Sequence, residues 1–85
     1  MKTHYGYCIM QVTEESTGVI TRRAIYVSNS LKRIREKLYE YARGLELQGD
    51  WEIVPPYYRD AATIANTTTG EEIELNIDGV KIEIL

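Results

Sequence analysis

The chain has 85 residues, of which 44% are hydrophobic and 27% charged, and its formal net charge at pH 7 is −3. This size and composition predict one globular domain over residues 1–85, and they exclude a disordered chain. No apolar run approaches the ~18 residues that a membrane span needs, and the N-terminus does not resemble a signal peptide, so we expect a cytoplasmic protein with no membrane partner. Cys8 is the only cysteine and cannot form an internal disulfide, so a small fold held by packing alone could gain stability as a homodimer.

Two segments near the N-terminus are rich in residues that favour strands. They span residues 5–13 and 19–28 and contain mainly tyrosine, isoleucine and valine as their apolar members. The polar residues 14–18 lie between them and end in Gly18. This pattern predicts a β-hairpin with a loop of several residues.

One helix is predicted from about residue 31 to residue 47. Ser28, Asn29 and Ser30 precede it and are candidate N-caps. On a helical wheel the apolar residues fall within an arc of about 100°, and they are Leu31, Ile34, Leu38, Tyr41, Ala42 and Leu45. We expect this stripe to cover a sheet, and we expect the helix to end near Gly49 rather than Gly44 because the stripe continues past residue 44.

The second half of the chain predicts short strands separated by turns. Residues 51–54 favour a strand that Pro55 and Pro56 interrupt, because proline has no amide hydrogen to donate to a neighbouring strand. Residues 61–66 predict another short strand. The turn-rich sequence of residues 66–70 then leads into a strand over residues 71–77.

The dipeptide Asp78-Gly79, between two alternating apolar runs, predicts a final hairpin with a two-residue type I′ turn. In that hairpin the apolar residues would share one face, with Ile77 opposite Val80, Leu75 opposite Ile82, and Ile73 opposite Ile84. The same register would place Glu74 directly opposite Glu83, where the two carboxylates repel each other.

In chain order these elements predict a two-layer α+β fold. It would consist of a β-hairpin, one α-helix and an antiparallel meander of three or four strands, ββαβββ or ββαββββ. We expect the helix to pack on one face of the sheet and the other face to be solvated.

Residues suited to catalysis or metal binding are few. His4 and Cys8 are the only residues of their types, and four positions along a strand separate them by about 13 Å, which excludes a Cys–His pair. Two such residues cannot form a structural zinc site, and the six scattered glycines form no phosphate-binding loop. Glu72, Glu74 and Glu83 could attract a hard cation, and the last two could act as an acid–base pair, but a one-helix domain seldom encloses the pocket that such chemistry needs. We therefore expect no cofactor, no metal and no enzymatic activity.

Charges are sorted by position along the chain. Residues 22–43 hold seven of the ten basic side chains and two acids, whereas residues 44–85 hold nine acids and two bases. This basic block could bind nucleic acid through phosphate contacts and stacking, by means of Arg22, Arg23, Lys32, Arg33, Arg35, Tyr39 and Arg43, with Lys37 at its side. Against this function, the whole chain is acidic. Glu36 and Glu40 are also three or four residues from Lys32, Arg33 and Arg43, a spacing at which charges pair on a helix. Nucleic-acid binding is therefore the alternative function.

The preferred function is non-catalytic binding to another protein, as a small adaptor or inhibitor. Seven tyrosines and no phenylalanine suit half-exposed surfaces and interfaces. The candidate contact residues lie in the acidic half of the chain and are Tyr57, Tyr58, Glu72, Glu74 and Glu83. In size, acidity and order of elements the chain resembles small proteins of phages and mobile elements, some of which bind and inhibit host enzymes. That resemblance is one of architecture and identifies no partner and no site residue.

Overall fold

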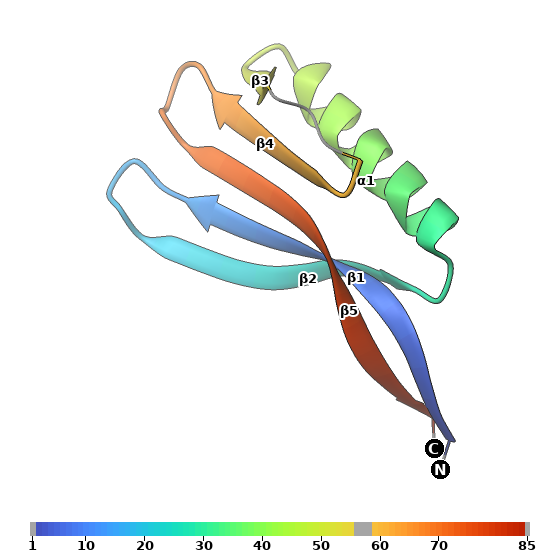
Figure 1. The fold of residues 1–85 in the computed structure, drawn as a ribbon. Helices are drawn as coiled ribbons and strands as arrows, with labels where there is room; N and C mark the ends of the chain where they lie inside the picture. The colour runs from blue at the N-terminus through green and yellow to red at the C-terminus, as the bar shows by residue number, and fades with distance from the viewer. Residues whose placement is uncertain (1, 56–58, 85) are drawn as a thin grey trace.

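The computed structural model describes residues 2–55 and 59–84. In these residues the chain forms five strands and one helix, which Figure 1 shows: β1 (Lys2–Glu14), β2 (Ile20–Ser28), α1 (Leu31–Glu46), β3 (Trp51–Val54), β4 (Ala61–Asn66) and β5 (Glu72–Ile84). The predicted α+β class and the order ββαβββ are confirmed.

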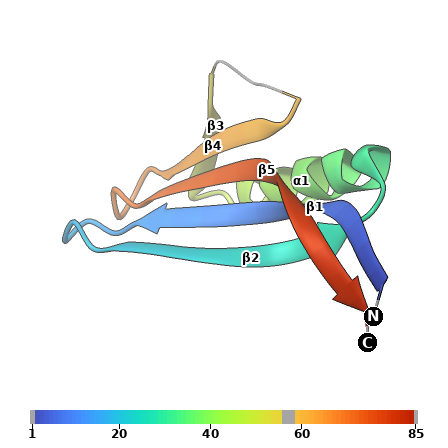
Figure 2. The same cartoon turned by 60° about the horizontal axis from the view of Figure 1, so that its bottom comes forward.

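All five strands belong to one antiparallel sheet with the order β2-β1-β5-β4-β3. The last strand thus returns to the centre of the sheet, between the first strand and the fourth. α1 packs against one face of this sheet and contacts all five strands (Figure 2). The structure therefore has the two layers that the amphipathic helix predicted.

The helix begins and ends as its sequence predicted. The Oγ of Ser30 accepts a hydrogen bond from the backbone N–H of Arg33 at 3.2 Å, which makes Ser30 the N-cap. Gly44 lies within α1, whereas Gly49 follows it with a φ of 92°, a left-handed conformation that glycine adopts without strain. The central residues of the predicted apolar stripe, Ile34, Leu38 and Ala42, are buried.

The turn predicted at residues 66–70 is stabilised by its own side chains. The Oδ1 of Asn66 accepts hydrogen bonds from the backbone N–H groups of Thr68 at 2.8 Å and Thr69 at 2.9 Å. Gly70 then has a φ of 78°. Asparagine and glycine at these positions are the residues that such a turn favours.

The core lies between α1 and the sheet. Its buried members are Ile9, Ile34, Leu38, Ala42, Ala62, Ile64, Ile73 and Leu75. Among the described side chains, the polar group of Gln11 is also buried beside them, at 7% exposure. Its Oε1 accepts a hydrogen bond from the Tyr41 hydroxyl at 3.2 Å, and its Nε2 donates one to the Thr13 Oγ1 at 3.0 Å, so its burial leaves no polar atom unpaired.

The predicted hairpin at Asp78-Gly79 is wrong. β5 is continuous from Glu72 to Ile84 and pairs with β1 along its whole length, from Lys2 opposite Ile84 to Glu14 opposite Glu72. A type I′ turn needs a positive φ at both central residues, and neither Asp78 nor Gly79 has one. β1 has 13 residues, and its residues 2–8 pair with residues 78–84 of β5. This long-range pairing replaces the local turn.

The apolar residues of β5 change face where the turn was expected. Ile73, Leu75 and Ile77 lie on the side of α1, whereas Val80 is opposite Gly6 on the other face. Alternate residues of a strand point to opposite faces, so a chain that continues through Gly79 cannot keep both apolar runs on one face. The predicted pairs of Ile77 with Val80, of Leu75 with Ile82 and of Ile73 with Ile84 are consequently absent from the ladders.

Candidate functional site

α1 covers one face of the sheet, and no other described element covers the opposite face, which we call the open face (Figure 2). The strand registers place its side chains in rows, because residues directly opposite each other in neighbouring strands share a face. The central row crosses the sheet from β2 to β3 and consists of Arg22, Val12, Glu74, Thr63 and Val54. The residues that alternate with this row, such as Ile64 and Leu75, point into the core.

A second row, nearer the β1–β2 loop, concentrates negative charge. It consists of Ile20, Glu14, Glu72, Ala65 and Glu52. Glu14 lies directly opposite Glu72, and both side chains are exposed. Like charges in directly opposed positions repel each other, so this pair reduces the stability of the fold. Both carboxylates are exposed and could contact a positively charged ligand.

Apolar side chains are exposed among these charges. Ile20 is 53% exposed, Val27 51% and Val54 38%, although all three lie in strands of the sheet. Met10 and Val12 lie half-buried between them. Between β2 and β3 the open face therefore combines apolar side chains with the carboxylates of Glu14, Glu52, Glu72, Glu74 and Asp78 and with the guanidinium of Arg22.

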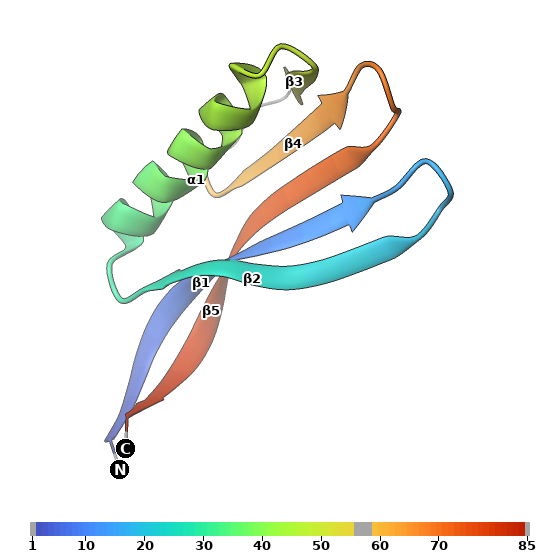
Figure 3. The ribbon, with the colours of Figure 1, turned by 180° about the vertical axis from the view of Figure 1, so that it is seen from behind.

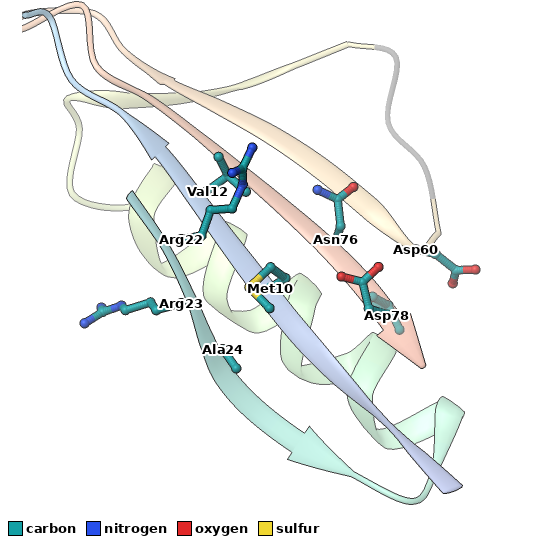
Figure 4. Close-up of a pocket in the computed structure, with 9 residues that line it drawn as sticks. Met10, Val12, Arg22, Arg23, Ala24, Asp60, Asn76 and Asp78 are labelled. Carbon is teal, nitrogen blue, oxygen red and sulfur yellow. The ribbon is translucent and has the colours of Figure 1, made fainter. Parts of the chain in front are cut away.

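A hollow of about 700 Å³ lies on the open face and is exposed to solvent (Figure 4). Met10 and Val12 line it from β1, and the side chains of Arg22 and Asp78 lie at its two sides. Next to it, a smaller hollow of about 190 Å³ is lined by Ile20, Glu14, Glu72 and Glu74, among others. Both hollows could accept side chains of a partner that presents apolar and basic groups.

The predicted carboxylate pair Glu74–Glu83 is wrong. Glu74 lies opposite Val12, whereas Glu83 lies opposite Thr3, nine residues further along the same strand. At 3.3 Å per residue the two positions are about 30 Å apart. Of the predicted acidic contact residues, Glu72 and Glu74 are together and exposed on the open face, and Glu83 is near the end of β5. Tyr57 and Tyr58 lie outside the described residues, so their role stays a prediction from the sequence.

The basic block is not one surface. Arg22 is opposite Val12 and Arg23 is opposite Gln11, so their side chains leave β2 on opposite faces, although both residues line the hollow on the open face. Lys32 and Arg33 are exposed in the first turn of the helix. The Arg33 Nε donates a hydrogen bond to the Tyr26 hydroxyl at 3.2 Å. The sheet thus separates bases that the sequence places side by side.

Three further bases of the block are in ion pairs. The Arg35 guanidinium donates two hydrogen bonds to the Asp60 carboxylate, at 2.6 and 3.3 Å. Lys37 pairs with Glu40 at 3.3 Å, and Arg43 pairs with Glu46. The pairs of Glu36 and Glu40 with Lys32, Arg33 and Arg43 that the spacing predicted are not among the ion pairs of the described residues. Tyr39 is 52% exposed among these charges, as predicted.

The Arg35–Asp60 pair gives a testable pH dependence. The hydrogen bond from Arg35 lowers the pKa of Asp60 from its ordinary value. A carboxyl whose pKa is lowered by folding contributes stability above its unfolded-state pKa of about 4, and this contribution is lost as the pH falls through the folded-state pKa. We expect Asp60→Asn to reduce the urea midpoint of unfolding at pH 7 and to have a smaller effect at pH 2.5. In an Arg35→Gln background the effect of Asp60→Asn should depend much less on pH, because only the charge of Arg59 then lowers the pKa of Asp60. An undiminished pH dependence there would contradict this assignment.

The lone thiol is placed as the sequence predicted. β1 is continuous through both His4 and Cys8, so the two residues keep their four-residue separation on an extended strand. Cys8 is 2% exposed and lies opposite Asp78. Burial, followed by the charge of Asp78, raises the pKa of its thiol. A buried thiol with a raised pKa is a poor nucleophile at neutral pH.

Sequence reasoning missed the apolar character of the open face. Cys8, Met10 and Val12 alternate with Ile9, so both faces of β1 carry apolar side chains. This pattern is the signal that could have revealed it, because a strand with one solvated face alternates apolar and polar residues. The pairing of Asp60 with Arg35 was also missed, since 25 positions separate the two residues.

Comparisons with protein-family models, curated proteins and solved structures found no match to this chain. The described residues contain no group of three or more histidine, cysteine, aspartate or glutamate side chains placed to hold a metal ion. Within the same part of the chain, no helix has the length and apolarity needed to cross a membrane.

Proposed function

We propose that this protein is a non-catalytic protein-binding module, and that its open face binds a protein surface on which basic side chains surround apolar ones. The observation that carries the proposal is the composition of that face: exposed Ile20, Val27 and Val54 lie among the carboxylates of five acidic residues, with Arg22 beside them. Apolar side chains in the centre of a contact supply affinity, and complementary charges around them guide association and specificity.

The opposition of Glu14 and Glu72 supports a basic partner in particular. Two carboxylates in directly opposed positions weaken the isolated protein. A lysine or arginine of a partner that docks between them would replace this repulsion with attraction. Part of the affinity would then come from relief of this repulsion between two exposed carboxylates.

The alternative function, nucleic-acid binding through the basic block, has weaker support. A phosphate backbone needs several bases on one surface. Arg22 and Arg23 lie on opposite faces of the sheet, and Arg35, Lys37 and Arg43 are already in ion pairs. The remaining exposed bases, Lys32 and Arg33, are few for tight binding to an oligonucleotide.

An affinity capture with matched charge-reversal variants tests the proposal. The bait is the purified protein, the source is a nuclease-treated extract of the cells that produce it, and captured proteins are then purified for titration. We expect Glu72→Lys/Glu74→Lys to weaken binding of a specifically captured protein by about tenfold or more, because reversed charges would face its bases. Lys32→Glu/Arg33→Glu, the matched reversal on the helix, should bind as the unaltered protein does.

The opposite pattern would contradict the proposal. If the helix reversal abolishes capture and the sheet reversal does not, the open face is not the working surface. If the protein binds arbitrary duplex or single-stranded oligonucleotides with an affinity that falls steeply with salt, and the helix reversal together with Arg22→Ala and Arg23→Ala abolishes that binding, the alternative function holds instead.

A further inference from the structure

The two ends of the described chain form a two-stranded ribbon that projects from the body of the sheet (Figures 1 and 3). β2 pairs with β1 only as far as Tyr7, and β4 pairs with β5 only as far as Asn76. Beyond these positions, residues 2–6 of β1 and 80–84 of β5 pair only with each other, and we call this segment the arm. An isolated two-stranded ribbon is marginally stable in water. The arm would therefore gain stability from a third strand.

The outer edge of β5 in the arm has unpaired backbone groups. The backbone N–H of Ile77 donates to the carbonyl oxygen of Asp60 at 3.0 Å, so the backbone groups of residue 77 point toward β4. Alternation along the strand then directs the backbone groups of residues 79, 81 and 83 to the same side, where no described strand lies. Such an edge is a template for another strand.

The charges along this edge select one register for antiparallel pairing with a second copy. Residues whose backbone groups point outward must face each other, so only residues 79, 81 and 83 can form hydrogen-bonded pairs. Registers that oppose two Lys81 residues or two Glu83 residues place like charges together, which is destabilising. Registers centred on Val80 or Ile84 oppose no charged residues. The register in which Ile82 faces Ile82 of the partner subunit places Lys81 opposite Glu83 of the partner subunit, twice by symmetry, and is therefore the one that opposite charges favour.

We propose that the β5 edge of the arm is a homodimer interface in this register. A two-fold axis brings the same edge of both copies together, so the edge must be complementary to itself. A lysine and a glutamate two residues apart meet this requirement, because each lysine then faces a glutamate of the other copy. The alternation Val80-Lys81-Ile82-Glu83-Ile84 also places apolar positions opposite apolar positions, since Val80 would face Ile84 of the partner subunit. This interface lies in the arm, away from Glu14, Glu72 and Glu74, so it goes beyond the proposed function and is tested separately from it.

A charge swap tests the interface. Sedimentation equilibrium should give twice the 9.8 kDa mass of the chain at high protein concentration. Lys81→Glu and Glu83→Lys should each raise the dissociation constant about tenfold or more, because each makes both symmetric pairs like-charged. Lys81→Glu/Glu83→Lys, which has the composition of the natural protein, should restore the dimer. Within the protomer these residues lie opposite the uncharged Tyr5 and Thr3, so the swap makes no like-charge pair between β1 and β5.

A disulfide trap tests the register itself. Opposed residues of a pair without mutual hydrogen bonds have Cα atoms about 4.5 Å apart, which a disulfide can bridge. Ile82→Cys should therefore cross-link two copies under mild oxidation, whereas Val80→Cys, about 13 Å from its counterpart in this register, should not. Cys8 is buried and should remain unreactive.

Three results would overturn the proposal. The first is a protein that remains monomeric up to millimolar concentration. The second is a dimer that neither single charge reversal weakens, since its interface would lie elsewhere. The third is efficient cross-linking of Val80→Cys without cross-linking of Ile82→Cys, which would establish a different register. Circular dichroism of each variant must match that of the natural protein for these results to count.

Discussion

Leu38→Ala is expected to reduce the free energy of unfolding by about 2–5 kcal/mol, the largest effect of any single substitution proposed for this protein. Leu38 is 1% exposed and lies near the middle of α1, in the core cluster between the helix and the sheet. Truncation removes buried apolar surface and leaves a cavity that the neighbouring strands can only partly fill. A small domain has an unfolding free energy of about 5–15 kcal/mol, so a loss of this size removes a large fraction of the stability of the fold. Urea denaturation followed by circular dichroism measures it.

Leu47→Ala is the matched control. It makes the same chemical change, but Leu47 is 77% exposed and lies just after α1. Its effect should be within about 0.5 kcal/mol of zero, as for other surface substitutions. Equal effects at the two positions would mean that α1 does not cover the sheet with its predicted stripe.

The parts of the fold that sequence reasoning predicted are those determined by neighbouring residues. The apolar stripe of α1, its N-cap at Ser30 and its end before Gly49 all depend on contacts within a few positions. The turn at Asn66 is likewise closed by its own side chain. In these segments the local preferences of the residues agree with the final structure, so the sequence pattern alone was sufficient to predict the helix and the turn.

The hairpin at Asp78-Gly79 failed because a long-range pairing competed with a local one. The dipeptide favours a turn strongly, but β1 offers residues 2–8 as partners for residues 78–84. Nothing in the sequence near Gly79 reveals that β1 continues past Tyr7, where its pairing with β2 ends. The change of apolar residues from odd to even positions after Gly79 is visible in the sequence, and it fits either a turn or a continuous strand whose apolar residues change face.

In the candidate site, too, sequence reasoning failed where long-range strand pairing decides the arrangement. The prediction of a solvated acidic face correctly anticipated exposed Glu72 and Glu74. The charge partner of Arg35 and the opposition of Glu14 to Glu72 could not be predicted, because both depend on which strands become neighbours. Strand order places three acids from β1, β5 and β3 in one row, and this order is a property of the whole chain.

Tyr41→Phe is expected to reduce the free energy of unfolding by about 1–3 kcal/mol, although it removes a single oxygen atom. The Tyr41 hydroxyl donates to the Oε1 of Gln11 at 3.2 Å, and Gln11 is 7% exposed. Without the hydroxyl, the buried carbonyl oxygen of Gln11 loses its partner and cannot readily reach water. The penalty for an unpaired buried acceptor exceeds the net value of the hydrogen bond itself, and urea denaturation measures it.

The double variant Gln11→Met/Tyr41→Phe separates this cause from a loss of packing. Methionine has a similar length and no polar atom that requires a partner, and replacing both members of a buried hydrogen bond by apolar groups is often nearly neutral. The double variant should therefore be more stable than Tyr41→Phe alone, with a coupling free energy of about 1 kcal/mol or more between the two positions. Thr13 would lose the hydrogen bond from Gln11, but it is only half-buried and can bind water instead. If the two substitutions simply add, Gln11 has another partner in solution, and the contact with Tyr41 does not account for its burial between helix and sheet.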